Sequence, residues 1–307
     1  MRSFCSLNLT ALLTTFVVNL FSQMKFKLSN IPALPAVLLA IVSVQSGAAI
    51  AKSLFPTIGA PATASLRIGI SAIILFLVNR PNFKKITNSQ WRLVIPYGIC
   101  LGAMNLVFYF SIERIPIGLA VTLEFIGPLL LAVIGSKRIL DFLWVALAAF
   151  GIILIAPWTG EGIDFLGLSL ALLAGAFWAA YIVLGGKVSK VMDGNKAVSV
   201  GMIVASILVV PFGIFSEGIL NLTPSLFGFG IALALLSSAI PFTLEMNALR
   251  VIPAKTFSIL MSLEPAMAAV CAFLFLQEYL VFNEILAIVL VITASVGATL
   301  TVKKQTT

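Results

Sequence analysis

Two acidic residues lie in the middle of long apolar runs. Glu124 is followed four residues later by Pro128, and Glu264 directly precedes Pro265. A charge in hydrocarbon costs at least about 2.5 kcal/mol on insertion scales, so such a residue usually has a function. Each proline also removes a backbone donor and frees a carbonyl one turn upstream. We interpret each glutamate with its freed carbonyl as a cradle for a substrate ammonium group. The alternative is a carboxyl that is protonated or paired within the protein.

Further polar residues occur in the other apolar runs. Arg67 could pair with Glu124 or Glu113, or it could bind a substrate carboxylate through two parallel N–H donors. Lys52 and Glu245 lie closer to the ends of their runs, where a charged group reaches solvent more easily. Amide groups are costly to bury without partners. The candidate substrate-binding residues are Glu124, Glu264, Arg67, Lys52, Gln45, Asn105, Tyr109, Trp178, Tyr181 and Glu245.

Residues that usually carry catalysis or bind metals are scarce. The chain has no histidine, which removes the commonest metal ligand and the usual proton shuttle near neutral pH. Its three cysteines are widely spaced and form neither a metal-binding nor a disulfide pattern. We therefore predict a protein that is not an enzyme, with no metal and no cofactor. Any coupling to protons would have to use carboxylates.

The composition indicates a protein that is solvated by lipid. Of 307 residues, 61% are apolar and 10% are charged, against about 45–50% and about 25% in a typical soluble domain. Too few polar side chains remain to cover a water-exposed surface. The net charge of +8 would suggest nucleic acid as a partner in a soluble protein. Here the basic residues sit in short loops between apolar runs, which is typical of membrane proteins.

The apolar runs predict an all-α polytopic membrane protein with ten transmembrane helices and no soluble domain. A membrane-crossing helix needs roughly 20 mostly apolar residues. The predicted helices lie near 34–54, 60–79, 92–111, 116–135, 141–157, 165–186, 197–216, 225–248, 254–276 and 281–301.

Loop charge predicts the orientation of these helices. Most of the 19 Lys and Arg residues fall in alternate loops, on the same side as both ends of the predicted bundle, and acidic residues dominate the other loops. Because cytoplasmic loops are enriched in Lys and Arg, we predict that both termini are cytoplasmic. Residues 1–30 precede the first predicted helix. The basic stretch from Met24 to Lys27 suggests a later start, so 1–30 is predicted to be an extension that is mis-started or disordered.

An internal repeat relates the two halves of the chain. Residues 115–133 resemble 252–270 at an offset of 137 residues, with an Ile-Pro pair at the start of each segment and Pro128 aligned with Pro265. The repeat predicts five-helix halves at 31–158 and 163–303. Five is odd, so the second half would be inverted in the membrane. Inverted repeats are common in secondary transporters, with the substrate site near the midplane. The alternative is an old duplication whose present role is not transport.

Several polar and proline-containing segments share the pattern of a known family. They are Gln45-Ser46-Gly47-Ala48, Ala51-Lys52-Ser53-Leu54-Phe55-Pro56, Gly59-Ala60-Pro61, Leu66-Arg67, Leu123-Glu124-Phe125 with Gly127-Pro128, Pro241 with Leu244-Glu245-Met246, and Thr256-Phe257 through Leu260-Met261-Ser262-Leu263-Glu264-Pro265-Ala266. In these segments the chain resembles the EamA family of the drug/metabolite transporter superfamily. The similarity extends over about residues 31–303 and covers nearly the whole predicted bundle.

The resemblance implies a function as well as a fold. It implies an exporter of small neutral amino acids, such as threonine or homoserine, that acts across the inner membrane and is driven by a proton gradient. Glu124 and Glu264 would face the substrate ammonium, and Arg67 or Lys52 would lie near its carboxylate. Two alternatives stay open. One is a transporter of another solute, such as a different amino acid, an amphipathic drug or a nucleotide-linked metabolite. The other is a receptor or scaffold, which would not need opposed carboxylates.

Overall fold

Every regular element in the computed structural model is a helix within residues 31–134, 139–155, 164–276 and 282–300, the parts of the chain that the structure describes. The prediction of an all-helical protein is therefore confirmed for these ranges. The predicted extension at 1–30 lies outside the described residues, as does the basic C-terminal segment after residue 300.

The helices follow the predicted apolar segments closely. They are α2 (Ala33–Asn79), η1 (Phe83–Lys85), α3 (Asn88–Ile112), α4 (Ile117–Glu124), α5 (Ile126–Val133), α6 (Ile139–Ile155), α7 (Phe165–Val191), α8 (Gly194–Ile214), η2 (Glu217–Asn221), α9 (Pro224–Ala234), η3 (Leu235–Ala239), α10 (Ile240–Val251), α11 (Ala254–Leu260), η4 (Met261–Leu263), α12 (Glu264–Leu276) and α13 (Phe282–Leu300). Five stretches are long and apolar enough to cross a membrane: α2, α3, α7, α8 and Pro224–Val251. The other apolar helices are shorter.

A glycine divides the 47-residue α2 into two segments. Gly59 has φ 72° and ψ 167° inside the helix, a conformation that is essentially restricted to glycine. Pro56 precedes the break and Pro61 follows it. A proline near the start of a helical segment is tolerated because its missing N–H needs no partner there. The break falls between the predicted helices 34–54 and 60–79.

Replacing Gly59 by alanine is expected to lower the thermal stability of the purified protein. The positive φ costs a residue with a Cβ about 1–3 kcal/mol. Gly228 of α9 is the matched control, because an added Cβ there meets nothing within 4 Å. We expect Gly228→Ala to leave the unfolding midpoint unchanged or to raise it slightly. Equal midpoints for the two variants in detergent would contradict the conformational argument.

Helix interruptions occur at both carboxylates of the repeat. The predicted helix 116–135 consists of α4 and α5, which are separated at Phe125, three residues before Pro128. The predicted helix 254–276 is interrupted by the 3₁₀ turn η4, directly before Glu264 and Pro265. Prolines disrupt the helical hydrogen-bond ladder in this way. Glu124 is therefore the last residue of α4 and Glu264 the first of α12, so each carboxylate lies at a helix end.

A third irregularity lies between α9 and α10. Residues Leu235–Ala239 form a π-helical turn, and Pro241 follows at the start of α10. Single π turns inside helices are often found at functional sites. This turn packs against α2.

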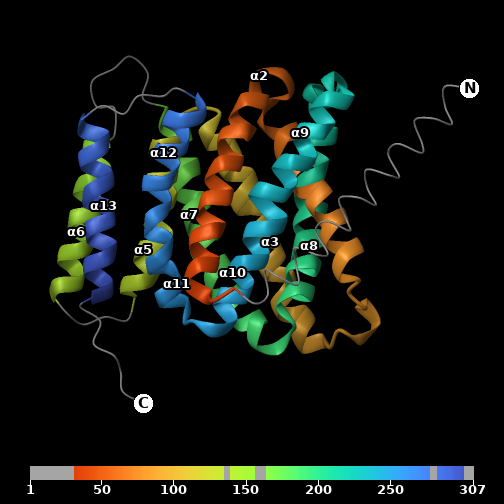
Figure 1. Ribbon diagram of the computed structural model, residues 1–307, viewed down its shortest axis with the longest axis horizontal. Coiled ribbons are helices and arrows are strands. Elements are labelled where there is room, and N and C mark those ends of the chain that lie inside the picture. Colours follow the sequence, from red (N-terminus) through yellow and green to blue (C-terminus); the bar gives the residue numbers. More distant parts are fainter. Residues whose placement is uncertain (1–30, 135–138, 156–163, 277–281, 301–307) are drawn as a thin grey trace, which may run out of the picture.

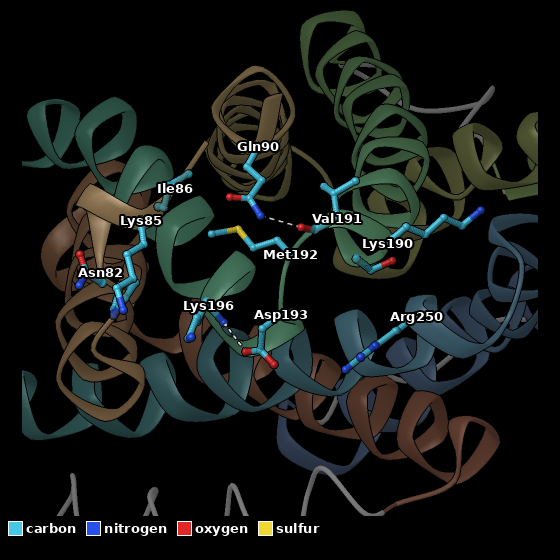
Figure 2. A pocket seen from close by; sticks show the side chains of 12 residues that line it. Asn82, Lys85, Ile86, Gln90, Lys190, Val191, Met192, Asp193, Lys196 and Arg250 are labelled. Carbon is cyan, nitrogen blue, oxygen red and sulfur yellow. Dashed lines mark hydrogen bonds between the residues drawn. The ribbon is translucent and has the colours of Figure 1, made fainter. Parts of the chain in front are cut away.

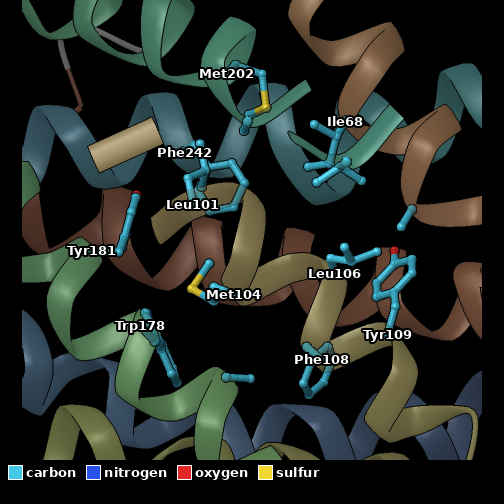
Figure 3. Packing of buried hydrophobic residues seen from close by; sticks show 14 of the residues in the cluster. Ile68, Leu101, Met104, Leu106, Phe108, Tyr109, Trp178, Tyr181, Met202 and Phe242 are labelled. Atoms are coloured by element: carbon cyan, nitrogen blue, oxygen red, sulfur yellow. The ribbon is translucent and has the colours of Figure 1, made fainter. Parts of the chain in front are cut away.

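The helices pack in pairs that join the two halves of the chain. α3 packs on α7 and α8, and α2 packs on α8 and α10. α6 and α13 lie side by side at one end of the molecule (Figure 1). In the centre of the molecule, aromatic and methionine side chains fill the space between α3, α7 and α10 (Figure 3).

Two glycines allow the interrupted helix α4–α5 to approach α7 very closely. A Cβ added to Gly127 would overlap the backbone carbonyl of Gly175, and a Cβ added to Gly175 would overlap the backbone carbonyl of Glu124. The Glu124 carbonyl is the one that Pro128 frees, four residues downstream. Close backbone approach through small residues is a common way to pack helices in membranes.

Candidate functional site

A cavity of about 50 Å³ lies in the core, next to the helix interruptions. Residues from α2, α3, α4, α7, α10 and α12 contribute to it, so both halves of the chain are represented. Its lining consists of Val44, Gln45, Ala48, Arg67, Met104, Asn105, Phe108, Val121, Glu124, Trp178, Phe242, Glu245 and Glu264. The structure therefore brings most of the predicted site residues to one place, although the chain separates them by more than 200 positions.

Three carboxyl groups face this cavity. Glu124, Glu245 and Glu264 are 8%, 3% and 6% exposed. Glu264 accepts a hydrogen bond from Gln45 Nε2 at 2.9 Å, and Glu245 accepts one from the Tyr181 hydroxyl at 3.0 Å. Among the described residues no group of three His, Cys, Asp or Glu side chains is close enough to hold one metal ion. The carboxyl groups thus line the cavity without converging on a point.

Gln45 has an unused acceptor in this cavity. Its Nε2 group is bound to Glu264, but its Oε1 atom is buried and has no hydrogen-bond partner in the described part of the chain. Leaving a buried amide oxygen unpaired costs about 1–3 kcal/mol. A ligand with an N–H or ammonium donor would remove this cost.

Arg67 is the buried cation of the site, and neutral groups hold it. Its Nε donates to the Ser238 hydroxyl at 2.8 Å, its Nη1 to the Tyr109 hydroxyl at 3.2 Å, and its Nη2 to the Ser237 carbonyl. Its guanidinium carbon also lies 5.4 Å from the centre of the Tyr109 ring. A guanidinium has five N–H donors, and these contacts use three of them.

Arg67 does not form the ion pair with Glu124 or Glu113 that was one of the two alternatives left open by the sequence. No carboxylate oxygen of the described residues accepts a hydrogen bond from Arg67, and Glu113 instead accepts one from the Ala60 backbone N–H at 3.3 Å. The π turn explains the difference, because it presents the Ser237 carbonyl and the Ser238 hydroxyl directly to the guanidinium.

Three of the predicted residues do not line the cavity. Tyr109 and Tyr181 lie behind it and support lining residues, since their hydroxyls contact Arg67 and Glu245. Lys52 is half-buried on α2 and is absent from the lining. The side chains of Gln45, Asn105 and Trp178 do reach the cavity, and Asn105 Nδ2 donates to the Leu101 carbonyl at 2.7 Å.

Sequence reasoning missed part of the site. Ser237 and Ser238 were not among the candidate residues, yet they fix the position of Arg67. Apolar lining residues such as Met104, Phe108 and Phe242 carry no sequence signal that separates them from ordinary core residues. The signal that could have identified Ser237 and Ser238 is their position four and three residues before Pro241, where the helix is expected to be irregular.

The cavity is small for a binding site, and we refer to this conformation as the closed state. A volume of about 50 Å³ holds only a few water molecules, and sites for small molecules usually measure about 300–1,000 Å³. A ligand could therefore occupy this site only after the surrounding helices or side chains move apart. The site combines a fixed cation, three carboxyl groups and an unpaired amide oxygen in an otherwise apolar environment, which suits a small solute with charges of both signs.

Comparisons with known proteins show the family of this chain. The family model of the EamA-like transporter family matches residues 165–300. The threonine/homoserine exporter RhtA of Escherichia coli (strain K12) is 43% identical over 277 residues, covering 89% of this chain and 93% of that protein. RhtA of Salmonella typhimurium (strain LT2) is 43% identical over 271 residues, covering 87% and 91%.

Two more distant matches extend the comparison. The uncharacterized transporter YwfM of Bacillus subtilis (strain 168) is 25% identical over 252 residues, covering 79% of this chain and 84% of that protein. A crystal structure of a protein with 15% sequence identity has a TM-score of 0.64, and the match covers 87% of this chain and 96% of that one. This second likeness concerns the fold alone. From the identity and coverage of the RhtA matches, the chain belongs to the EamA-like transporter family.

Proposed function

We propose that this protein is a secondary transporter that exports small neutral amino acids, such as threonine or homoserine, across the inner membrane. The observation that carries the proposal is the core cavity, which holds a guanidinium, three carboxyl groups and an unpaired amide oxygen from both halves of the chain. The relatives named threonine/homoserine exporter, at 43% identity over most of the chain, support this substrate class.

We propose that each pole of a zwitterionic amino acid has its own partners. The ammonium group binds between Gln45 Oε1, Glu264 and Glu124, where acceptors are available. The carboxylate binds Arg67 through the N–H donors that the protein does not use. Charge-assisted hydrogen bonds of this kind are roughly twice as strong as neutral ones. Lys52 has no role in this arrangement because it lies outside the cavity lining.

We propose that transport is coupled to protons, and the charge balance of the cavity supports this. If all three carboxyl groups were ionised, the site would carry one positive and three negative charges in a small, apolar space. Removing each ion from water costs several kcal/mol, so we propose that at least one carboxyl group carries a proton in the closed state. Release of this proton would accompany substrate movement.

We further propose that the bundle consists of ten transmembrane helices in two inverted halves, at 31–158 and 163–303, with both termini in the cytoplasm. Helix packing supports this arrangement. α3 packs on α7 and α10 packs on α2, the pair α6–α13 joins equivalent helices of the two halves, and α5 packs on α11 as α4 packs on α12. The family model covers 165–300, which lies within one proposed half. Alternating access would then arise from rocking of one half against the other.

Replacing Arg67 by lysine is expected to lower efflux by roughly tenfold while the protein stays folded. Lysine keeps the positive charge but cannot reproduce the planar fork that contacts Ser238, Ser237 and Tyr109. The loss should appear mainly as a raised KM for substrate. Arg92→Lys is a suitable control, since Arg92 is exposed near the start of α3. Unchanged transport in Arg67→Lys would remove the proposed carboxylate partner.

An efflux assay tests the function itself. Cells that express the chain and cells that carry an empty vector are loaded with labelled homoserine, threonine or an uncharged amphipathic dye. We expect faster efflux of the two amino acids, greater resistance to excess homoserine, and no change for the dye. Equal amino-acid efflux with and without the chain would overturn the substrate assignment, and faster dye efflux alone would favour a drug transporter.

A further inference from the structure

A second hollow, of about 580 Å³, lies away from the buried carboxyl groups, where the ends of several helices meet. It is much larger than the core cavity, but it contains none of the buried charges that suggest transport chemistry. Its lining consists of Pro81, Asn82, Lys85, Ile86, Gln90, Ser189, Lys190, Val191, Met192, Asp193, Lys196 and Arg250 (Figure 2). The loop charges predict that this end of the bundle faces the cytoplasm.

Cations from four separate elements converge on this hollow. Lys85 comes from η1, Lys190 from α7, Lys196 from α8 and Arg250 from α10. The carboxylate in the lining is Asp193, whose Oδ1 accepts the Lys196 backbone N–H at 3.2 Å and so caps α8. Among the described residues, none of the four cations forms an ion pair within 4.0 Å. The lining therefore carries four positive charges against one negative charge, which favours a bound anion.

The volume of the hollow and its uncharged lining residues indicate which class of ligand it can bind. A volume of about 580 Å³ falls within the range of small-molecule sites. Gln90 Nε2 donates to the Val191 carbonyl at 2.7 Å, which joins the start of α3 to the end of α7 and fixes one wall. Ile86, Val191 and Met192 supply apolar surface beside the cations. Lysine side chains are common phosphate partners, so a phosphate group attached to a less polar body fits this lining.

Aromatic residues next to the hollow favour a lipid as the source of the phosphate. Phe83 stacks between Phe76 and Trp91, with ring centres 6.2 and 6.3 Å apart. Phe76 and Phe83 are each about two-fifths exposed. Trp side chains are enriched at the level of the lipid headgroups, and Trp91 directly follows Gln90, which lines the hollow. Trp91 therefore supports a place for the hollow near the headgroups.

We propose that this hollow binds a phosphate-bearing anion, with the headgroup of an anionic phospholipid as the favoured source. The anion bridges Lys85 of the first half of the chain to Lys190, Lys196 and Arg250 of the second. It would therefore hold these helix ends together in the closed state. The proposal does not depend on which solute the core cavity transports.

The chain offers a matched pair of double variants to test this. Lys85→Gln with Lys190→Gln removes two lining charges. Lys84→Gln with Lys187→Gln removes two exposed charges from neighbouring positions that do not line the hollow. Purified full-length protein in neutral detergent is titrated with dioctanoyl phosphatidylglycerol, inorganic pyrophosphate or dioctanoyl phosphatidylcholine, and the thermal midpoint reports binding.

We expect the lining pair to weaken phosphatidylglycerol binding at least about tenfold and the neighbouring pair to change it less than about twofold. A Lys85→Arg, Lys190→Arg variant keeps both positive charges and should retain binding. It shows whether the glutamine variant binds weakly because it lacks the charges or because it is misfolded. Binding of phosphatidylglycerol alone identifies the lipid source, and binding of pyrophosphate as well identifies free phosphate compounds. Equal weakening by both glutamine pairs would overturn the proposal, as would a parent protein that binds neither anion more tightly than phosphatidylcholine.

Discussion

Glu264→Gln is expected to reduce homoserine efflux by about 100-fold while leaving the protein folded. Glutamine has nearly the same shape as glutamate and can still accept the hydrogen bond from Gln45 Nε2. What it loses is the negative charge that would face the substrate ammonium. A hydrogen bond to a charged group contributes about 1.5–3 kcal/mol, and 2.7 kcal/mol corresponds to about 100-fold in rate. Transport is measured in everted membrane vesicles at equal protein levels.

Two companion variants make this result interpretable. Glu124→Gln is expected to lose efflux by at least about tenfold, because it removes the second acceptor at the same cavity. Glu217→Gln changes an exposed glutamate in η2 and should transport like the parent. Normal efflux in both Glu264→Gln and Glu124→Gln would remove the proposed carboxylate mechanism and leave only the family relationship.

The largest expected loss of stability belongs to Gly175. Gly175→Val places a branched side chain where a single Cβ would already overlap the Glu124 backbone carbonyl. Backbone cannot move aside as the end of a flexible side chain can, so α4 and α7 would have to separate. Overpacking in a tight core costs about 1–3 kcal/mol and occasionally more, and we expect a value at the upper end. The yield of monodisperse protein and its thermal midpoint measure the effect.

A control on the same helix isolates this contact. Gly186 also lies in α7, but a Cβ there would meet the Ala254 Cβ at 3.9 Å, an ordinary van der Waals distance. Gly186→Ala should therefore change the thermal midpoint little, and Gly175→Ala should already lower it clearly. Similar midpoints for the two alanine variants would mean that α7 adjusts more freely than its packing against Glu124 indicates.

Much of the helical architecture could be predicted because its cause is local. The length of each apolar run is visible in the sequence, and so are the prolines near Glu124 and Glu264 that interrupt two of the helices. The break at Gly59 falls in the expected gap between two runs, although the sequence did not indicate that α2 would continue through it without a loop.

Site residues could be predicted from the sequence only where a charged side chain lies within an apolar run. Glu124, Glu264, Arg67 and Glu245 were identifiable on that basis, and all four line the cavity. The partners of Arg67 were not, because Ser238 is 171 positions away and its contact with Arg67 depends on the π turn between α9 and α10. Lys52 was expected near the site, but it lies outside the cavity lining.

The π turn at Leu235–Ala239 also bears on how sequences of this family should be compared. Such a turn holds one more residue than a regular α-helical turn, and here the extra residue directs Ser237 and Ser238 toward Arg67. A homologue with a regular helix at this place would be one residue shorter between Thr223 and Pro241. A one-residue gap there in an alignment would then mark a homologue that anchors its arginine differently.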